Sequence, residues 1–169
     1  PNTTDANGRR YRFSNQSQIA QWNLLQLAEA IYPLINETTP LELALQHYNN
    51  YYQQQWQAMM ATKLGFAHSS SEIEMLAKGL LKLLESIETD MTLFYRALAS
   101  FDLPETDFED NELLQSIFAK VWYQPEQVDA SYLDQLKAWL IQYRKICTSL
   151  ALSEADRVQQ MNSVNPKYV

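Results

Sequence analysis

The chain has 169 residues and a formal net charge of −7, with 46% hydrophobic residues but only 3 Gly, 6 Pro and 1 Cys. Sandwiches and barrels need turn residues about every 8–12 positions, so this shortage of Gly and Pro argues against an all-β fold and against a Gly-rich nucleotide loop. The acidic balance argues against a broad nucleic-acid surface, which draws its affinity from clustered Lys and Arg. We therefore expect an all-α protein, a single domain over residues 1–169 built as an irregular bundle of about six or seven helices.

The first part of the chain predicts a loop and one helix. Residues 1–13 show no apolar period and read as a loop that leads into the domain. Ser14 or Asn15 can cap the helix, and Pro33 should kink or end it. Its apolar stripe recurs every three positions, at Ile19, Trp22, Leu25, Ala28 and Ile31.

The second predicted helix begins at a capping box. In Thr39-Pro40-Leu41-Glu42, the hydroxyl and the carboxylate can satisfy otherwise unpaired backbone N–H groups, and Pro stands at the first helical position. The helix should extend to Lys63, with Gly65 as a left-handed stop after it. Tyr48, Tyr51, Tyr52 and Trp56 fall at spacings of three and four, which favours core packing over a stacking platform, with Tyr51 as the expected outlier.

Four or five further helical segments follow, depending on whether the third helix continues or a new one begins at residue 90. A third helix should start at Ser71 or just before it, and its interior Gly79 indicates close packing of another element. Thr89 or Asp90 can cap a continuation to Phe101, and an acidic loop over residues 104–110 precedes a short helix that ends before Pro125. The last two segments run from Leu133 to Ile146 and, after a cap made by Ser153 and Asp156, around the apolar Val158 and Met161.

Side chains that often carry chemistry give weak signals here. His47 and His68 are the only histidines and belong to no metal-ligand pattern, so we expect solvent-facing or hydrogen-bonded structural roles. Cys147 cannot form a disulfide within the chain and lies on an apolar stretch, which should raise the pKa of its thiol. The carboxylates of the acidic loop and of Glu112 suit a solvated helix start better than acid–base catalysis. We therefore expect no catalytic, cofactor-binding or metal-binding residue within these 169 residues.

One segment near the start has more fixed polar and aromatic positions than helical periodicity requires. It reads Asp5-x-x-Gly8-Arg9-Arg10-Tyr11-x-Phe13-x-Asn15-Gln16-x-x-Ile19-x-x-Trp22-Asn23-Leu24. This segment closely resembles a block of the SelO or YdiU family of protein adenylyltransferases, which have a pseudokinase fold. The matching positions are Asp5, Gly8, Arg9, Arg10, Tyr11, Phe13, Asn15, Gln16, Trp22 and Asn23.

Further pieces that resemble the family follow in the same order. They are Lys63-Leu64-Gly65-Phe66, then Asp90-x-Thr92-x-x-Tyr95-Arg96-x-Leu98, then Trp139-x-x-x-Tyr143-Arg144, and last Met161-Asn162-x-Val164-Asn165-Pro166. Of these pieces, we single out Arg96, Trp139, Tyr143, Arg144, Asn165 and Pro166 as structural family residues. Five ordered matches extend over nearly the whole chain and make chance resemblance a poor explanation.

The resemblance implies an activity for a longer parent protein. Family members transfer AMP from ATP to Ser, Thr or Tyr hydroxyls of proteins, with Mg²⁺ or Mn²⁺ at the phosphates. The family's nucleotide, catalytic and metal residues precede the block that starts this chain. We therefore expect a C-terminal piece, equivalent to the end of a kinase-like C-lobe and its helical extension, that binds no cofactor and is inactive alone.

The implied partners are the N-terminal catalytic part of the same protein and the protein substrates of the parent, without nucleic acid or membrane. Trp22, Leu25 and Ile31 would pack beneath the active-site loops, and Arg9 or Arg10 would anchor an acidic residue of the catalytic part. The expected location is the cytoplasm of a bacterium, or a mitochondrion if the parent is eukaryotic. The alternative is a stand-alone helical module that binds a protein partner through exposed aromatic residues.

Overall fold

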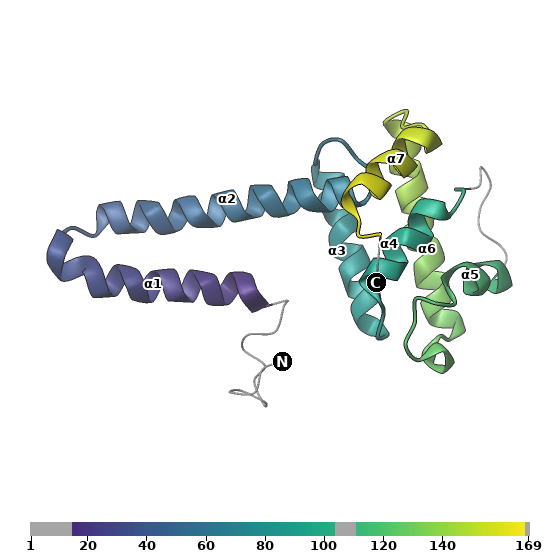
Figure 1. Cartoon of the computed structure of the whole chain (residues 1–169), viewed down its shortest axis with the longest axis horizontal. Helices are drawn as coiled ribbons and strands as arrows, with labels where there is room; N and C mark the ends of the chain where they lie inside the picture. The colour runs from purple at the N-terminus through teal and green to yellow at the C-terminus, as the bar shows by residue number, and fades with distance from the viewer. Residues whose placement is uncertain (1–14, 104–110, 168–169) are drawn as a thin grey trace. The chain divides into compact units, whose positions relative to one another are not determined.

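The computed structural model describes residues 15–103 and 111–167, and in these ranges the fold is helical (Figure 1). The one β pairing among the described residues is an isolated bridge between Thr89 and Trp122. The predicted all-α class is confirmed. The elements are α1 (Gln16–Ile35), α2 (Thr39–Lys63), α3 (Ser71–Ser86), α4 (Met91–Ser100), α5 (Asn111–Phe118), the 3₁₀ turn η2 (Pro125–Gln127), α6 (Ala130–Ser149) and α7 (Glu154–Val164).

The chain divides into two compact units, Pro1–Trp56 and Gln57–Val169, and the boundary lies within α2. We call them unit 1 and unit 2 and describe each by itself. The expectation of a single domain over residues 1–169 stays a prediction.

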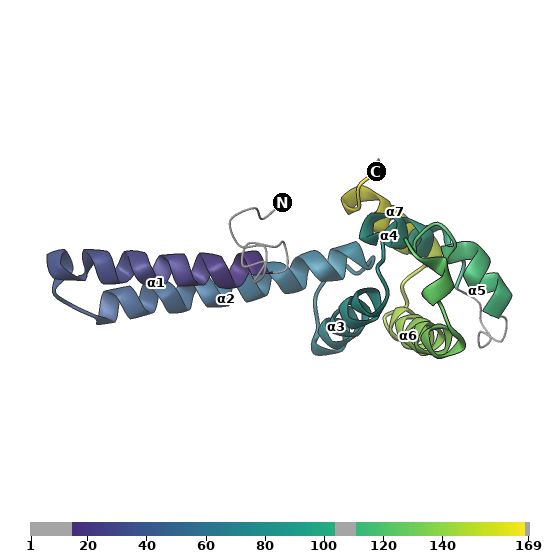
Figure 2. The same ribbon diagram turned by 90° about the horizontal axis from the view of Figure 1, so that it is seen from below.

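The described part of unit 1 is a helical hairpin in which α1 and the first part of α2 lie side by side (Figures 1 and 2). Helix α1 continues past Pro33 to Ile35, and it stops at Asn36, whose left-handed backbone (φ 57°) donates its N–H to the Tyr32 carbonyl at 2.7 Å. None of residues 15–56 is buried. The predicted core role of the hairpin tyrosines is therefore wrong in this structure: Tyr52 is exposed, as is Tyr51, the expected outlier.

Side-chain caps begin most helices of unit 2, as the sequence predicts. The Asp90 carboxylate accepts the Leu93 N–H at 2.9 Å, and the Ser153 hydroxyl accepts the Asp156 N–H at 3.1 Å. At α3 the cap is Ser70, just before the predicted start at Ser71, and its hydroxyl accepts the Ile73 N–H. Such caps satisfy amides that have no partner inside the helix, so they fix where each helix starts.

Helix α2 also begins one residue before its predicted capping box implies. The backbone N–H groups of Leu41 and Glu42 both donate to the Thr38 carbonyl at 3.0 Å. Thr39 is consequently the first helical residue rather than the cap.

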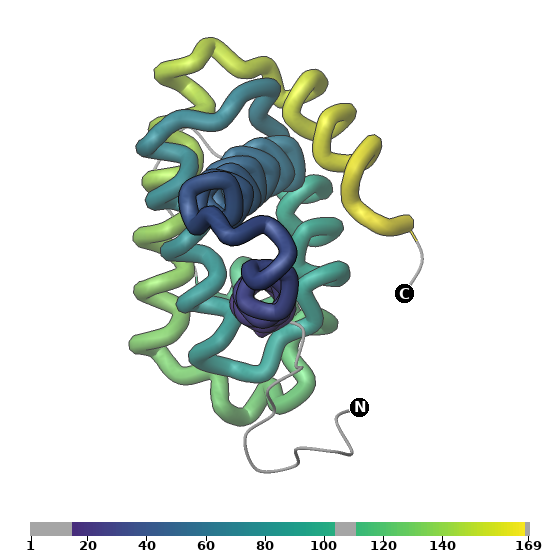
Figure 3. Tube along the Cα trace, turned by 90° about the vertical axis from the view of Figure 1, so that its left-hand side faces the viewer, coloured from purple at the N-terminus to yellow at the C-terminus, as the bar shows by residue number. Residues whose placement is uncertain are grey.

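In unit 2, α3 packs against α6 and α4 packs against α7 (Figures 2 and 3). Gly79 lies at the first contact, as its place in the helix indicates, and a Cβ there would lie 3.6 Å from Trp139 Cδ1, an ordinary contact distance. The Trp139 indole N–H donates to the Leu76 carbonyl at 2.9 Å. The aromatic core consists of Phe66, Phe94, Tyr95, Phe101, Phe118, Trp122, Tyr132, Trp139 and Tyr143.

Cys147 is buried in this core and the two histidines are exposed, as the sequence predicts. Burial raises the pKa of the Cys147 thiol from 9.0 to about 11, because the neighbouring apolar side chains disfavour the charged thiolate. The neighbourhood therefore does not activate the thiol as a nucleophile.

We predict that iodoacetamide modifies Cys147 far more slowly in the folded chain than in the urea-unfolded chain. The thiolate fraction at pH 8 is about 100-fold lower in the folded chain on the pKa difference alone, and burial adds to the effect. The rate should level off above about pH 9 in the unfolded chain and keep rising toward pH 11 in the folded chain. Equal rates at pH 8, measured by mass spectrometry, would contradict the buried placement.

Candidate functional site

The family-like residues belong to both units, and those of unit 1 come first. Six of the predicted residues lie outside the described ranges: Asp5, Gly8, Arg9, Arg10, Tyr11 and Phe13. Asn15 immediately precedes α1 without a side-chain cap, Gln16 begins α1, and Trp22 and Asn23 are exposed. The described part of this block therefore forms one helix start rather than a reactive cluster.

The family-like pieces of unit 2 come together where α2 and α4 end. The last carbonyl groups of a helix have no partner within it, and burying them unpaired is costly. Three side chains from outside α2 and α4 donate hydrogen bonds to these carbonyls. We call them the donor cluster, which consists of Tyr143, Arg157 and Asn165.

The end of α2 is closed by a Schellman motif and by two members of the donor cluster. The Gly65 N–H donates to the Thr62 carbonyl and the Phe66 N–H to the Ala61 carbonyl, with Gly65 in the left-handed region at φ 89°. The Tyr143 hydroxyl donates to the Leu64 carbonyl at 2.7 Å. The Asn165 amide donates to the Lys63 carbonyl at 2.9 Å and to the Met161 carbonyl at 3.0 Å.

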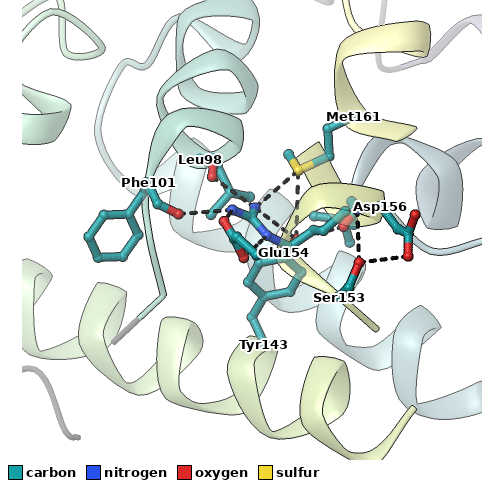
Figure 4. A network of polar contacts seen from close by, with 9 residues as sticks. Leu98, Phe101, Tyr143, Ser153, Glu154, Asp156 and Met161 are labelled. Carbon is teal, nitrogen blue, oxygen red and sulfur yellow. Dashed lines mark hydrogen bonds and ion pairs between the residues drawn. The ribbon is translucent and has the colours of Figure 1, made fainter. Parts of the chain in front are cut away.

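The end of α4 is closed by Arg157, which is only 1% exposed. Figure 4 shows residues that gather around this point, among them Leu98, Phe101 and Glu154. Arg157 Nη1 donates to the Leu98 carbonyl at 3.0 Å and its Nη2 to the Phe101 carbonyl at 2.9 Å. Its Nε donates to Glu154 one turn earlier on α7, and a second contact makes this ion pair bidentate. A cation at the C-terminus of a helix is also favoured by the helix dipole.

The electrostatics of the cluster keep Arg157 charged and Tyr143 neutral. Burial lowers the pKa of Arg157, but the hydrogen bond with Glu154 and the contacts with Tyr143 raise it by more than burial lowers it. The net result is a pKa above the ordinary value for arginine. Burial raises the pKa of Tyr143 well above its ordinary value. Such groups hold backbone in place and do not exchange protons near neutral pH.

Other family-like residues attach to the same region. Lys63 Nζ lies 5.1 Å from the centre of the Tyr95 ring and 3.4 Å from the Asn165 side-chain oxygen, and burial lowers the pKa of this lysine. Arg96 Nη1 donates to the Pro166 carbonyl at 3.4 Å. Arg144 is half-buried on α6, one residue after Tyr143.

Sequence reasoning missed Arg157 and its partner Glu154. The apolar pattern singled out Val158 and Met161 in α7, yet the buried residues of that helix are Arg157 and Met161. The available signal was the spacing: Arg157 precedes Met161 by four residues and follows Glu154 by three, which places all three on one helix face. Charged residues are rarely buried, so a pattern of apolar residues could not reveal this one.

The family profile described as protein adenylyltransferase SelO matches residues 1–169, the whole chain. The chain belongs to the SelO family. Four of the pieces that carried the resemblance in the sequence thus lie in and around the donor cluster of this family member.

Curated relatives share this assignment. The proteins named protein nucleotidyltransferase YdiU are 40% identical over 176 residues in Rhodopirellula baltica, 42% identical over 169 residues in Flavobacterium johnsoniae and 39% identical over 172 residues in an Azoarcus species. Each alignment covers 100% of this chain but only 31–33% of the relative. The chain therefore spans about a third of the length of these relatives.

The described residues form neither a metal-ion cluster nor a membrane-spanning helix. Within residues 15–103 and 111–167, no group of three or more His, Cys, Asp or Glu side chains could hold a metal ion. In the same ranges, no helix has the length and apolar character needed to cross a bilayer.

We predict that Gly65→Ala and Gly79→Ala change stability in opposite directions. A Cβ at Gly65 would lie 2.9 Å from Arg157 Cγ on a left-handed backbone, so the substitution should cost about 2 kcal/mol. A Cβ at Gly79 makes an ordinary contact within a helix, so this control should gain about 0.5–1 kcal/mol. Urea unfolding measures both, and equal effects would contradict the close packing at Gly65.

We also predict that Arg157→Met destabilises the chain by about 2–4 kcal/mol, because the buried Phe101 carbonyl loses its donor and the Leu98 carbonyl keeps only the Phe101 N–H. The matched control is Lys78→Met, which removes an exposed ion pair with Glu74 and should cost less than about 1 kcal/mol. Urea midpoints report both variants. Similar losses for the two would show that Arg157 is not a structural anchor.

Proposed function

We propose that this chain is the C-terminal helical region of a SelO-type protein adenylyltransferase, which transfers AMP from ATP to Ser, Thr or Tyr hydroxyls of proteins. The observation that carries the proposal is the family match over residues 1–169 together with relatives about three times as long. Those relatives are named nucleotidyltransferases, a class that includes AMP transfer.

Within that enzyme, the chain acts as a structural support. Its family-like residues in unit 2 satisfy helix ends and fill a core, and the buried Tyr143 and Cys147 both have pKa values raised by burial. Nucleotidyl transfer depends on positioned cations around the phosphates. Within the part of the chain that the structure describes, the one buried arginine is Arg157, and it is already engaged by Glu154 and two carbonyls.

The cofactors of the proposed parent are ATP and Mg²⁺ or Mn²⁺, and the proposal assigns them to its N-terminal catalytic part. Within residues 15–103 and 111–167, no group of three or more His, Cys, Asp or Glu side chains could hold a metal ion. We therefore assign no step of the reaction to a residue of this chain. The proposed partners are the N-terminal catalytic part and the protein substrates, and the proposed location is the cytoplasm of a bacterium.

We predict that the full-length protein, incubated with Mn²⁺ and ATP labelled at the α-phosphate, labels itself or added protein, whereas the 169-residue chain does not. A parallel reaction with ATP labelled at the γ-phosphate should give no protein label, because AMP transfer keeps the α-phosphate and releases the other two. Label transfer by the 169-residue chain would contradict the supporting role. Protein label from the γ-phosphate would show that the reaction is phosphoryl transfer and not AMP transfer.

We further predict that substituting both Arg9 and Arg10 by Gln in the full-length protein lowers its melting temperature and its AMP transfer together. The proposed reason is the loss of an anchor between this segment and an acidic residue of the catalytic part. Lys167→Gln, which also removes a positive charge near a chain end, serves as the control. Unchanged stability and transfer in the double variant would remove the anchor role.

A further inference from the structure

The hairpin of unit 1 carries an open apolar groove between α1 and α2, with a volume of about 410 Å³. Its apolar lining includes Leu25 and Tyr32 from α1 and Leu41 and Leu45 from α2. Two carboxylate residues, Glu29 and Glu42, also line the groove. The groove thus combines an apolar floor with negative charge, one carboxylate from each helix.

The hairpin lacks the burial that would keep its helices folded. No residue from 15 to 56 is buried. Even the large apolar side chains of Trp22 and Leu25 on α1 have exposed fractions of 45% and 42%. Most helical stability in proteins comes from packing an apolar face, and two helices without buried residues gain little of it. The hairpin therefore needs a polypeptide segment that packs permanently on its apolar face, which we call the cover. Permanent interfaces are larger and more apolar than transient ones.

The charge of the hairpin indicates the chemistry of the cover. Residues 15–56 include Glu29, Glu37 and Glu42 but no Lys or Arg, so this stretch cannot neutralise its own groove. Glu29 accepts a hydrogen bond from the neutral Gln26. Covering a carboxylate with apolar surface is costly unless a cation accompanies it.

We propose that a segment of the longer protein, outside residues 1–169, covers this groove with apolar side chains flanked by Lys or Arg that face Glu29 and Glu42. The relatives extend over about three times the length of this chain, which supplies the polypeptide for such a cover. The inference rests on the proposed function, since it assumes the longer protein. It adds that the cover is basic and that it holds unit 1 folded.

The test is hydrogen exchange followed by mass spectrometry, on the full-length protein and on the 169-residue chain. In the full-length protein, amides of residues 15–56 should exchange at least about tenfold more slowly than in the shorter chain. Glu29→Lys combined with Glu42→Lys should abolish that protection, and Glu29→Gln with Glu42→Gln should weaken it. The control Glu37→Lys, which alters the one other carboxylate in the stretch outside the groove lining, should leave protection unchanged.

Each other outcome overturns the proposal in a recognisable way. Equal protection of the hairpin in the 169-residue chain would mean that no outside segment is needed, and protection that rises with its concentration would identify a second copy as the cover. Protection that survives both double variants would mean that the cover is not basic. Amides of residues 57–169 provide the internal reference for global unfolding, and labelling from α-phosphate ATP tests the proposed function separately.

Discussion

The carbonyl groups at the ends of α2 and α4 are the constraint on which unit 2 depends. A helix leaves its last carbonyl groups largely without backbone partners, and in a buried position such groups need donors from elsewhere. The Leu98 carbonyl also accepts the Phe101 N–H at the end of its own helix. Tyr143 on α6, Arg157 on α7 and Asn165 after α7 supply those donors. The same contacts that satisfy the backbone therefore fix which helices meet, because each donor belongs to a different element from its acceptor.

Arg157 has the largest part in this arrangement. A buried guanidinium is costly on its own, but here it has a carboxylate partner, two carbonyl acceptors and the negative end of a helix dipole. Gly65 completes the fit, since a side chain there would collide with the arginine stem. The family-like Lys63-Leu64-Gly65-Phe66 piece thus forms the end of α2 and packs against Arg157.

The sequence predicted the helices well and their ends moderately well. Gly65, Asp90 and Ser153 marked boundaries correctly because caps act over a few residues and leave a local signature. The predicted core positions of the hairpin were wrong, because a stripe of apolar residues shows that a face can be covered and not that anything within the chain covers it. The spacing of Arg157 from Glu154 and Met161 was visible in the sequence. Its backbone acceptors were not predictable, since they lie more than fifty residues away.

The most direct test of this account is a double-mutant cycle between Tyr143→Phe and Arg157→Met, with the free energy of unfolding measured in urea. The two side chains touch, with Arg157 Nη1 at 3.4 Å from the Tyr143 hydroxyl, and they close the ends of two different helices. If the donor cluster acts as a unit, the double variant loses less than the sum of the single losses by about 1 kcal/mol or more. Losses that add to within about 0.3 kcal/mol would show that the two helix ends are secured independently, and would contradict the account.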